Sequence, residues 1–227
     1  MALEAITLYI GDGESVGLVG LNGAGKTTLL KTIVGLIVNF GGEVLVRGTS
    51  ARDRKARAGT SFLPEDFSPP FYLTGYDFVS YMGRLCGEKM IRSEVDRFAE
   101  TLELDVHVLA QPIRTYSKGM RQKLGLLAAL LPDRDTIILD EPLSGLDPGA
   151  RVIVKDALAV LRKKGRTIFF SSHILTDLQE IADRLVIIDE GMKIFDGGPE
   201  ELRSLGGRSL EEAFLHVIRS NVNGEAG

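Results

Sequence analysis

The most distinctive chemical pattern in the chain is a glycine-rich segment that ends in lysine and threonine. Glycines let the backbone turn its N–H groups inward around a phosphate, a following helix adds partial positive charge, lysine reaches the terminal phosphates, and a threonine hydroxyl can bind Mg²⁺. The segment matches the phosphate-binding P-loop pattern over its full length, so we expect it to bind a nucleoside triphosphate. The expected contact residues are Gly20, Leu21, Asn22, Gly23, Ala24, Gly25, Lys26, Thr27 and Thr28.

Two adjacent acidic residues, Asp140 and Glu141, follow the β-branched apolar run Thr136–Leu139. Open α/β sheets bind ligands at the carboxyl ends of their strands, where this pair would lie. We expect Asp140 to hold Mg²⁺ and Glu141 to polarise the attacking water, because hydrolysis needs a base beside the γ-phosphate. The simpler alternative is that one of the two caps the next helix or faces solvent.

A second small anion-binding turn is predicted at Ser117 and Gly119, directly before another apolar helical pattern. Taken alone, Ser117 is better explained as the N-cap of that helix. One nucleotide does not need two phosphate cradles on one face, so a second cradle in the same chain requires an explanation of its own.

The elements that must position these residues alternate between short apolar runs and helical periodicity, which predicts an α/β fold with a mostly parallel sheet. The middle of the chain reads as helical. The predicted strands are Ser15–Gly20, Val44–Arg47, Ser61–Leu63, Thr136–Leu139, Thr167–Ser171 and Leu185–Asp189. The predicted helices are Lys26–Leu36, Tyr76–Leu85, Ile91–Leu104, Lys118–Leu130, Val152–Lys163 and Leu175–Ala182, with a short C-terminal helix containing Leu210, Phe214 and Val217.

Composition is that of a soluble globular protein of one domain, with 227 residues, 44% hydrophobic and 26% charged. The formal charge of −4 gives no global reason to expect nucleic-acid binding. The single cysteine, Cys86, cannot form an internal disulfide, and a reducing, cytoplasmic location is expected. The longest apolar stretch, Leu124–Leu131, is far shorter than the roughly 20 residues that cross a bilayer, so another chain would have to span any membrane involved.

The order of the motifs along the chain resembles the ATP-binding cassette (ABC) family, and the resemblance covers essentially the whole sequence. It is carried by the P-loop, by Ser117–Met120, by the acidic pair, by Ser144–Asp147 directly after it, and by His173 at a strand end. The resemblance implies a P-loop NTPase of ABC type, with a mostly parallel α/β core, a small antiparallel β lobe and an inserted helical lobe.

The resemblance also implies a head-to-tail dimer with two ATP molecules between its subunits. Ser117, Lys118 and Gly119 would then bind the γ-phosphate of ATP held by the other subunit, and Asp147 would cross the interface. His173 would contact the γ-phosphate and act with Glu141 in catalysis. The expected cofactors are ATP and Mg²⁺, with the metal at Thr27, Glu65 and Asp140.

Two positions depart from the family pattern. Where the family usually has a glutamine that binds Mg²⁺ and water, this chain has Glu65, which can accept hydrogen bonds but adds negative charge, so we expect nucleotide binding to depend more strongly on Mg²⁺. Glu65 is alternatively a solvated loop residue. The aromatic strand that normally stacks on adenine would precede Ala2, and its absence predicts either a truncated start or a different adenine contact; Tyr9 is expected in the following strand.

The partner expectations follow from a closer resemblance to ATPase subunits of ABC-2 type exporters. Such a chain would form a dimer, expected to be a homodimer, and would dock under a separate membrane permease at the inner face of the cell membrane, with no nucleic acid. Pro69–Leu73 and Tyr76–Tyr81 supply apolar and aromatic groups for the permease groove, or belong to the core.

The predicted domain division is an ABC ATPase domain at 1–205, with the helical lobe at about 68–131, and a helical tail at 206–227. An alternative function is an ABC ATPase that acts on ribosomes or nucleic acid; the basic run at residues 52–57 could meet phosphate, although a solvated surface turn explains it better. A small-molecule kinase is a third alternative, but it leaves Ser117–Met120 and Asp147 unexplained.

Overall fold

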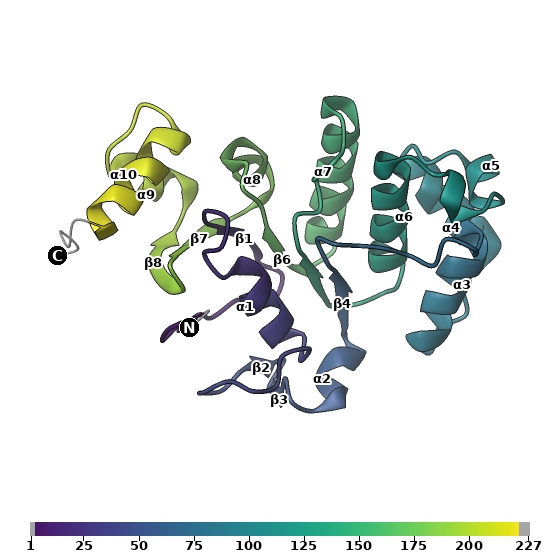
Figure 1. The fold of residues 1–227 in the computed structure, drawn as a ribbon, viewed down its shortest axis with the longest axis horizontal. Coiled ribbons are helices and arrows are strands. Elements are labelled where there is room, and N and C mark those ends of the chain that lie inside the picture. The colour runs from purple at the N-terminus through teal and green to yellow at the C-terminus, as the bar shows by residue number, and fades with distance from the viewer. Residues whose placement is uncertain (1–2, 223–227) are drawn as a thin grey trace.

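The computed structural model describes residues 3–222, which form a six-stranded sheet covered by helices, with a separate two-stranded hairpin (Figure 1). The strand order is β4-β5-β6-β1-β7-β8, in which all pairs are parallel except β7–β8. Its strands are β1 (Ser15–Val19), β4 (Thr60–Leu63), β5 (Thr136–Leu139), β6 (Thr167–Ser171), β7 (Arg184–Asp189) and β8 (Met192–Gly197). The antiparallel hairpin pairs β2 (Leu45–Val46) with β3 (Thr49–Ser50). The predicted α/β core and antiparallel lobe are confirmed.

The helices follow the strands as crossover connections and as a group between β4 and β5. Their bounds are α1 (Lys26–Ile33), α2 (Arg54–Ala58), α3 (Gly75–Leu85), α4 (Arg92–Thr101), α5 (Val106–Leu109), α6 (Lys118–Leu130), α7 (Pro148–Lys163), α8 (Leu175–Ile181), α9 (Pro199–Ser204) and α10 (Leu210–Val222), with a 3₁₀ turn at Ile113–Thr115. Every regular element between β4 and β5 is helical, which agrees with the expected helical lobe.

The central strand shows why the sheet is parallel and covered on both faces. All five residues of β1 are buried, as expected for a strand that has helices on both sides. Val16 and Leu18 pack with Leu30 of α1 on one face. Gly17 faces α8, where an added Cβ would lie 2.6 Å from Leu178 Cδ2. The strand therefore fixes α1 and α8 on opposite faces of the sheet.

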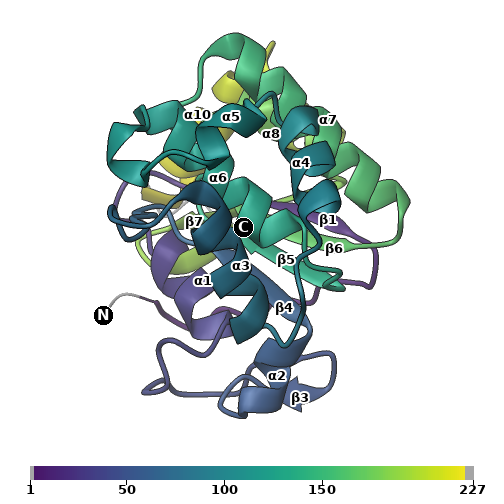
Figure 2. The same cartoon turned by 90° about the vertical axis from the view of Figure 1, so that its right-hand side faces the viewer.

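The helices α3, α4, α5 and α6 lie together at one side of the molecule, while β2, β3 and α2 form one end of it in both views (Figures 1 and 2). Helix α6 connects the helical group to the sheet because it packs against β4 as well as against α3 and α4. Leu124 and Leu127 of α6 are completely buried in the larger core cluster. This packing sets the position of the residues at the start of α6.

Most predicted elements agree with the structure to within a few residues, and three of them, 118–130, 136–139 and 167–171, agree at both ends. The placement of Tyr9 in a strand was wrong: its side chain is 81% exposed, and its carbonyl accepts a hydrogen bond from the guanidinium of Arg184 rather than pairing with a strand. Five further elements were not predicted from the sequence, and they are short or lie at the sheet edge: β3, β8, α2, α5 and α9.

The C-terminal helix α10 packs on α8, α9 and β8. Its inward residues belong to the larger core cluster: Leu210, Ala213, Phe214 and Ile218 are all at least nine-tenths buried. The predicted boundary between 1–205 and a tail at 206–227 stays a prediction. Within residues 3–222, none of the helices has the length and apolar character needed to cross a bilayer.

Candidate functional site

The phosphate loop connects β1 to α1 through backbone conformations that glycine adopts easily. Gly23 and Gly25 have φ of +84° and +106°. A Cβ on Gly20 would lie 2.4 Å from the carbonyl oxygen of Ile188, so no larger residue fits there without moving β7. Gly25 occupies the N-cap of α1 without a side-chain cap, and the first turn of α1 contains no acidic residue. The first N–H groups of the helix are therefore open to an anion.

Lys26 folds back across this loop. Its ammonium donates to the carbonyl oxygen of Gly20 at 2.7 Å and to that of Leu21 at 3.3 Å, and the residue is only 8% exposed. Thr27 and Thr28 follow in the first turn of α1 and are partly exposed. The loop thus gathers a cation, hydroxyl groups and free backbone donors on one edge of the sheet.

Asp140 lies directly after β5 and is completely buried. Its Oδ1 accepts a hydrogen bond of 2.6 Å from the hydroxyl of Ser171, whereas its Oδ2 has no hydrogen-bond partner. A buried carboxylate oxygen without a partner is costly unless a cation or donor satisfies it. The donor set therefore fits a hard divalent cation, which takes oxygen ligands from carboxylates, hydroxyls and phosphates.

Glu141 and His173 form a pair at this same edge. The distance between Glu141 Oε2 and His173 Nδ1 is 2.8 Å, with the glutamate side chain 7% exposed and the histidine 56% exposed. Glu141 has a φ of +50°, which is unusual for a residue with a side chain and is typical of functional turns. A carboxylate directed at an accessible imidazole can orient and deprotonate a water molecule.

Glu65 lies in the negative field of the acidic pair. Glu65 is exposed, but partial desolvation of its carboxyl group raises the pKa of that group, the charges of Asp140, Glu141 and Asp66 raise it further, and Lys26 opposes the rise. The described residues contain no cluster of three or more His, Cys, Asp or Glu side chains that could hold a metal by themselves. A cation here would therefore need Thr27, water or a phosphate as additional ligands.

Ser117 is the N-cap of α6, so the simpler reading of this residue describes its local geometry correctly. Its Oγ accepts a hydrogen bond of 3.1 Å from the N–H of Met120, and the side chain is exposed. The aliphatic part of Lys118 covers Gly145, and Gly119 faces the carbonyl of the same glycine. The turn before α6 and the loop before α7 therefore form one continuous surface.

Asp147 has a similar role at the start of α7. Its Oδ1 accepts from the N–H of Ala150 at 3.0 Å, and these backbone hydrogen bonds hold the pKa of the exposed carboxyl group below its usual range. In Figure 1, α1 and α6 lie on opposite sides of β4, so the helix that follows the phosphate loop and the helix that Ser117 caps are separate elements of the fold. The structure therefore has two separate candidate phosphate contacts.

Two residues that the sequence analysis did not assign to the site support it. Ser171 Oγ donates to Asp140 and accepts from the N–H of Glu141 at 2.9 Å. Gln122 of α6 donates its amide to the carbonyl oxygen of Pro142 at 2.9 Å, which connects α6 to the loop after the acidic pair. Ser171 could have been noticed as a hydroxyl residue at the end of the strand beside β5.

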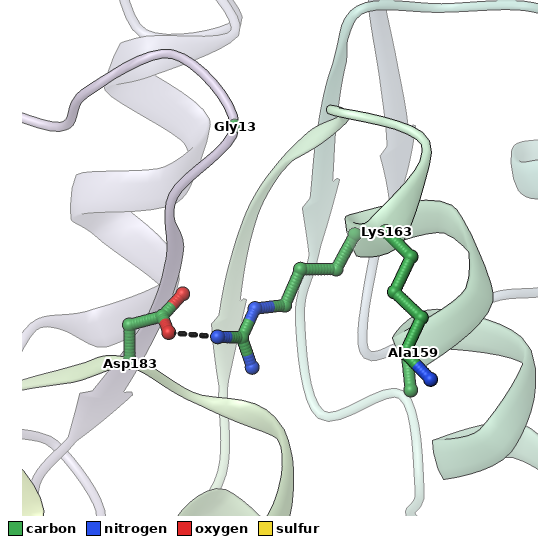
Figure 3. A pocket seen from close by; sticks show the side chains of 5 residues that line it. Gly13, Ala159, Lys163 and Asp183 are labelled. Carbon is green, nitrogen blue, oxygen red and sulfur yellow. Dashed lines mark hydrogen bonds and ion pairs between the residues drawn. The ribbon is translucent and has the colours of Figure 1, made fainter.

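A surface hollow of about 470 Å³ lies at the other edge of the sheet (Figure 3). It is lined by Gly13, Ala159, Arg162, Lys163 and Asp183, and Arg162 forms an ion pair with Asp183. Gly13 and Asp183 precede β1 and β7, so the hollow lies at the amino ends of these strands. It is therefore separate from the phosphate loop.

Comparison with known proteins agrees with this geometry. The family profile described as "ABC transporter" matches residues 3–144. An uncharacterised ABC transporter ATP-binding protein of Synechocystis is 36% identical over 88% of this chain and 58% of its own length. A Nod factor export ATP-binding protein I of Cupriavidus metallidurans is 33% identical over 89% of this chain and 68% of its own length. This chain spans about three fifths of the length of its relatives from Synechocystis and Nostoc.

Solved structures show the same fold. A structure described as the ATP-binding subunit of an ABC transporter has a TM-score of 0.86 and 30% identity, and the match covers 96% of this chain and 93% of the other. A bacterial Atm1-family ABC exporter with ATP bound has a TM-score of 0.82, with 21% identity over 94% of this chain and 38% of that chain, which supports the fold alone. The sequence matches and the shared fold together show that this chain belongs to the ABC transporter family.

Proposed function

We propose that the chain binds and hydrolyses ATP and couples this reaction to transport by a separate membrane protein. The observation that carries the proposal is the pairing of buried Glu141 with accessible His173, directly after an Asp140 that has one unpartnered oxygen. The phosphate loop follows β1, which is the neighbour of β6 in the same sheet. These groups match the needs of phosphoryl transfer to water, which are positioning, charge neutralisation and a base near the γ-phosphate.

In this proposal, the residues from Gly20 to Thr28 hold the phosphates of ATP. The N–H groups of the loop and of the first turn of α1 donate to phosphate oxygens, and Lys26 exchanges its contacts with the carbonyls of Gly20 and Leu21 for the terminal phosphates. Asp140 Oδ2, the hydroxyl of Thr27 and the carboxyl group of Glu65 would hold Mg²⁺. The metal would neutralise negative charge on the phosphates.

Glu141 accepts a proton from the attacking water, and His173 holds Glu141 in place while its exposed ring meets the γ-phosphate. The low exposure of Glu141 supports this assignment, because a base that is shielded from bulk water keeps a fixed orientation. Both residues come from strand ends at the ligand-binding edge, one following β5 and the other following β6.

A second copy of the chain would complete each ATP site. Ser117, Lys118 and Gly119 would reach the γ-phosphate bound by the partner subunit, and Asp147 would cross the interface between the two chains. The exposure of Ser117 and Asp147 and the position of α6 away from α1 in Figure 1 support this arrangement. One cassette that is similar in fold is described as dimeric and bound to ADP and Pi, with a TM-score of 0.81 and 22% identity.

The transport partner would be a membrane permease, which places the chain at the inner face of the cell membrane. Export is the direction favoured by relatives named for Nod factor export. Phe71 and Tyr72 are 51% and 83% exposed and could contact the permease, as could Tyr81 at 49%. Tyr76 is instead partly buried against the larger core cluster, and its hydroxyl donates to Asp96 at 2.5 Å.

The structure gives no support to a nucleic-acid role for the basic run at residues 52–57. Arg52 lies 4.4 Å from the ring centroid of Phe40 and donates to the carbonyl oxygen of the same residue. Arg57 donates to the carbonyl oxygen of Gly35. These contacts hold two of the four cations of the run against neighbouring loops, which favours a surface turn over a phosphate-binding patch.

The test is the substitution Glu141→Gln, which keeps the shape of the side chain but removes its basicity. ATP turnover should fall by about 10²–10⁴-fold while binding of ATP with Mg²⁺ is retained. Glu190→Gln is the matched control, because Glu190 is also a glutamate with positive φ but lies in the exposed turn between β7 and β8. Turnover by Glu141→Gln within about twofold of the parent protein would remove Glu141 from the mechanism.

A further inference from the structure

Ser171 makes two buried hydrogen bonds to the two acidic residues of the site. Its hydroxyl donates to Asp140 Oδ1 at 2.6 Å and accepts from the N–H of Glu141 at 2.9 Å. Ser171 is completely buried. A hydroxyl has one proton, which Ser171 donates to Asp140, so it can only accept a hydrogen bond from Glu141. The hydroxyl therefore acts as donor and as acceptor at the same time.

The sheet brings these residues together without any proximity in sequence. Strands β5 and β6 run in parallel, and Leu139 pairs with Phe170. Asp140 follows Leu139 and Ser171 follows Phe170, so these two residues lie beside each other at the edge of the sheet where ligands bind. Ser171 is at the end of β6, two residues before His173. His173 contacts the side-chain carboxylate of Glu141, whereas Ser171 contacts its backbone N–H.

The consequence for Asp140 is that its two oxygens differ. Oδ1 is occupied by Ser171, so the carboxylate cannot rotate freely, and Oδ2 is left as a buried oxygen without a partner. Groups that hydrogen-bond a metal ligand fix its orientation, and their loss typically reduces metal affinity or activity by about 10–100-fold.

The consequence for Glu141 is that its unusual backbone is held in place. A residue with a side chain in the left-handed region, here at φ +50°, is retained only where its surroundings fix it. The bond from the N–H of Glu141 to Ser171 supplies one such restraint, and the bond from its side chain to His173 supplies another.

We propose that Ser171 is a positioning residue for ATP hydrolysis, which presents Asp140 Oδ2 to Mg²⁺ and fixes the backbone of the base Glu141 through a single hydroxyl group. The inference rests on the proposed function of the site. It assigns to one buried serine a joint effect on metal binding and on the catalytic step.

Two other buried serines show that this arrangement is specific. Ser172 is next to Ser171, but its hydroxyl accepts from the N–H of Ile174 at 3.0 Å and belongs to the following turn. Ser15 begins β1, is completely buried, and its hydroxyl has no hydrogen-bond partner. Ser15 is therefore a matched control for the loss of a buried strand hydroxyl.

The experiment compares Ser171→Ala with Ser15→Ala in the full chain. Affinity for a fluorescent ATP analogue is measured in Mg²⁺ and in EDTA, together with kcat and KM for ATP and the thermal unfolding midpoint. For Ser171→Ala we expect the gain in affinity on adding Mg²⁺ to fall by about 10-fold or more and kcat to fall by about 10–100-fold, with affinity in EDTA within about twofold of the parent. Ser15→Ala should change none of these nucleotide parameters.

A Ser171→Ala protein that keeps the parent's Mg²⁺ dependence would overturn the proposal, even if its turnover were reduced. Equal effects of the two substitutions would also overturn it, because they would indicate a general role of a buried hydroxyl. Failure of the proposed function is a distinct result: the parent protein would then bind nucleotide without hydrolysing it, and the comparison in Mg²⁺ and EDTA would still decide the role of Ser171 at Asp140.

Discussion

At the scale of single residues, the site combines three carboxylates with one lysine. Desolvation raises the pKa of Glu65, the charges of Asp140 and Glu141 raise it further, and the charge of Lys26 opposes the rise. Adding a triphosphate to these groups increases the negative charge further. We therefore expect nucleotide binding to require a divalent cation more strongly than it would with a neutral residue at position 65.

The corresponding prediction concerns Glu65→Gln. Removing one negative charge near the phosphates should increase ATP affinity in EDTA by about fivefold, which corresponds to roughly 1 kcal/mol for one screened charge pair. Affinity in Mg²⁺ should change less, because the metal loses a ligand as the charge is removed. The measurement is titration of nucleotide with and without Mg²⁺, with Glu88→Gln in the helical group as a control. Identical metal dependence in the Glu65→Gln and parent proteins would refute this account.

The site was predictable where the chemistry lies in residue types and their order. The phosphate loop, Asp140, Glu141 and His173 were all proposed from the sequence, and the structure places Glu141 and His173 in hydrogen-bond contact. Ser171 was not proposed, because a serine at the end of an apolar run looks like an ordinary strand residue. Its function depends on the register between β5 and β6, which no local pattern records.

At the scale of elements, α10 forms part of the folded core rather than an independent appendage. Phe214 is 8% exposed and belongs to the same cluster as residues of the sheet, whereas Leu215, the next residue, is 44% exposed. Two neighbouring apolar residues of one helix therefore have opposite environments. This contrast allows the contribution of the helix to be measured without deleting it.

We expect Phe214→Ala to lower the free energy of unfolding by about 3–5 kcal/mol, because it removes a buried aromatic side chain and leaves a cavity. Leu215→Ala should change it by no more than about 0.5 kcal/mol. Urea denaturation of both variants measures the difference. Equal, small effects would show that α10 is not part of the cooperative core.

Elements whose residues are mostly buried were predicted from the sequence more accurately than elements whose residues are partly exposed. The parallel strand Thr167–Ser171 is buried almost throughout and was predicted at both ends. Most residues of the edge strand β8 are partly exposed, so its sequence lacks a buried apolar run and the strand was not predicted. Its formation depends on antiparallel pairing with β7. Helix α7 begins at Pro148, four residues before the predicted start at Val152, since Asp147 caps it and proline suits its first turn.

At the scale of the whole molecule, the chain has two exposed surfaces that each provide, in our proposal, part of a phosphate site. One is the loop before α1, and the other is the turn before α6 together with the loop before α7. Helices α1 and α6 lie apart in Figure 1, and a head-to-tail pair of chains would place the turn before α6 of one chain against the phosphate loop of the other. This arrangement would make association of the subunits depend on nucleotide.

Nucleotide-dependent pairing is tested by the mass of the Glu141→Gln protein in solution, measured by light scattering with ATP and Mg²⁺ and again with ADP. We expect the mass of two chains with ATP and of one chain with ADP. The further substitution Ser117→Arg, which places a bulky cation at the exposed turn, should prevent pairing but leave nucleotide binding to the single chain intact. A Glu141→Gln protein that binds ATP and remains a single chain at all concentrations would show that the two phosphate contacts do not form one shared site.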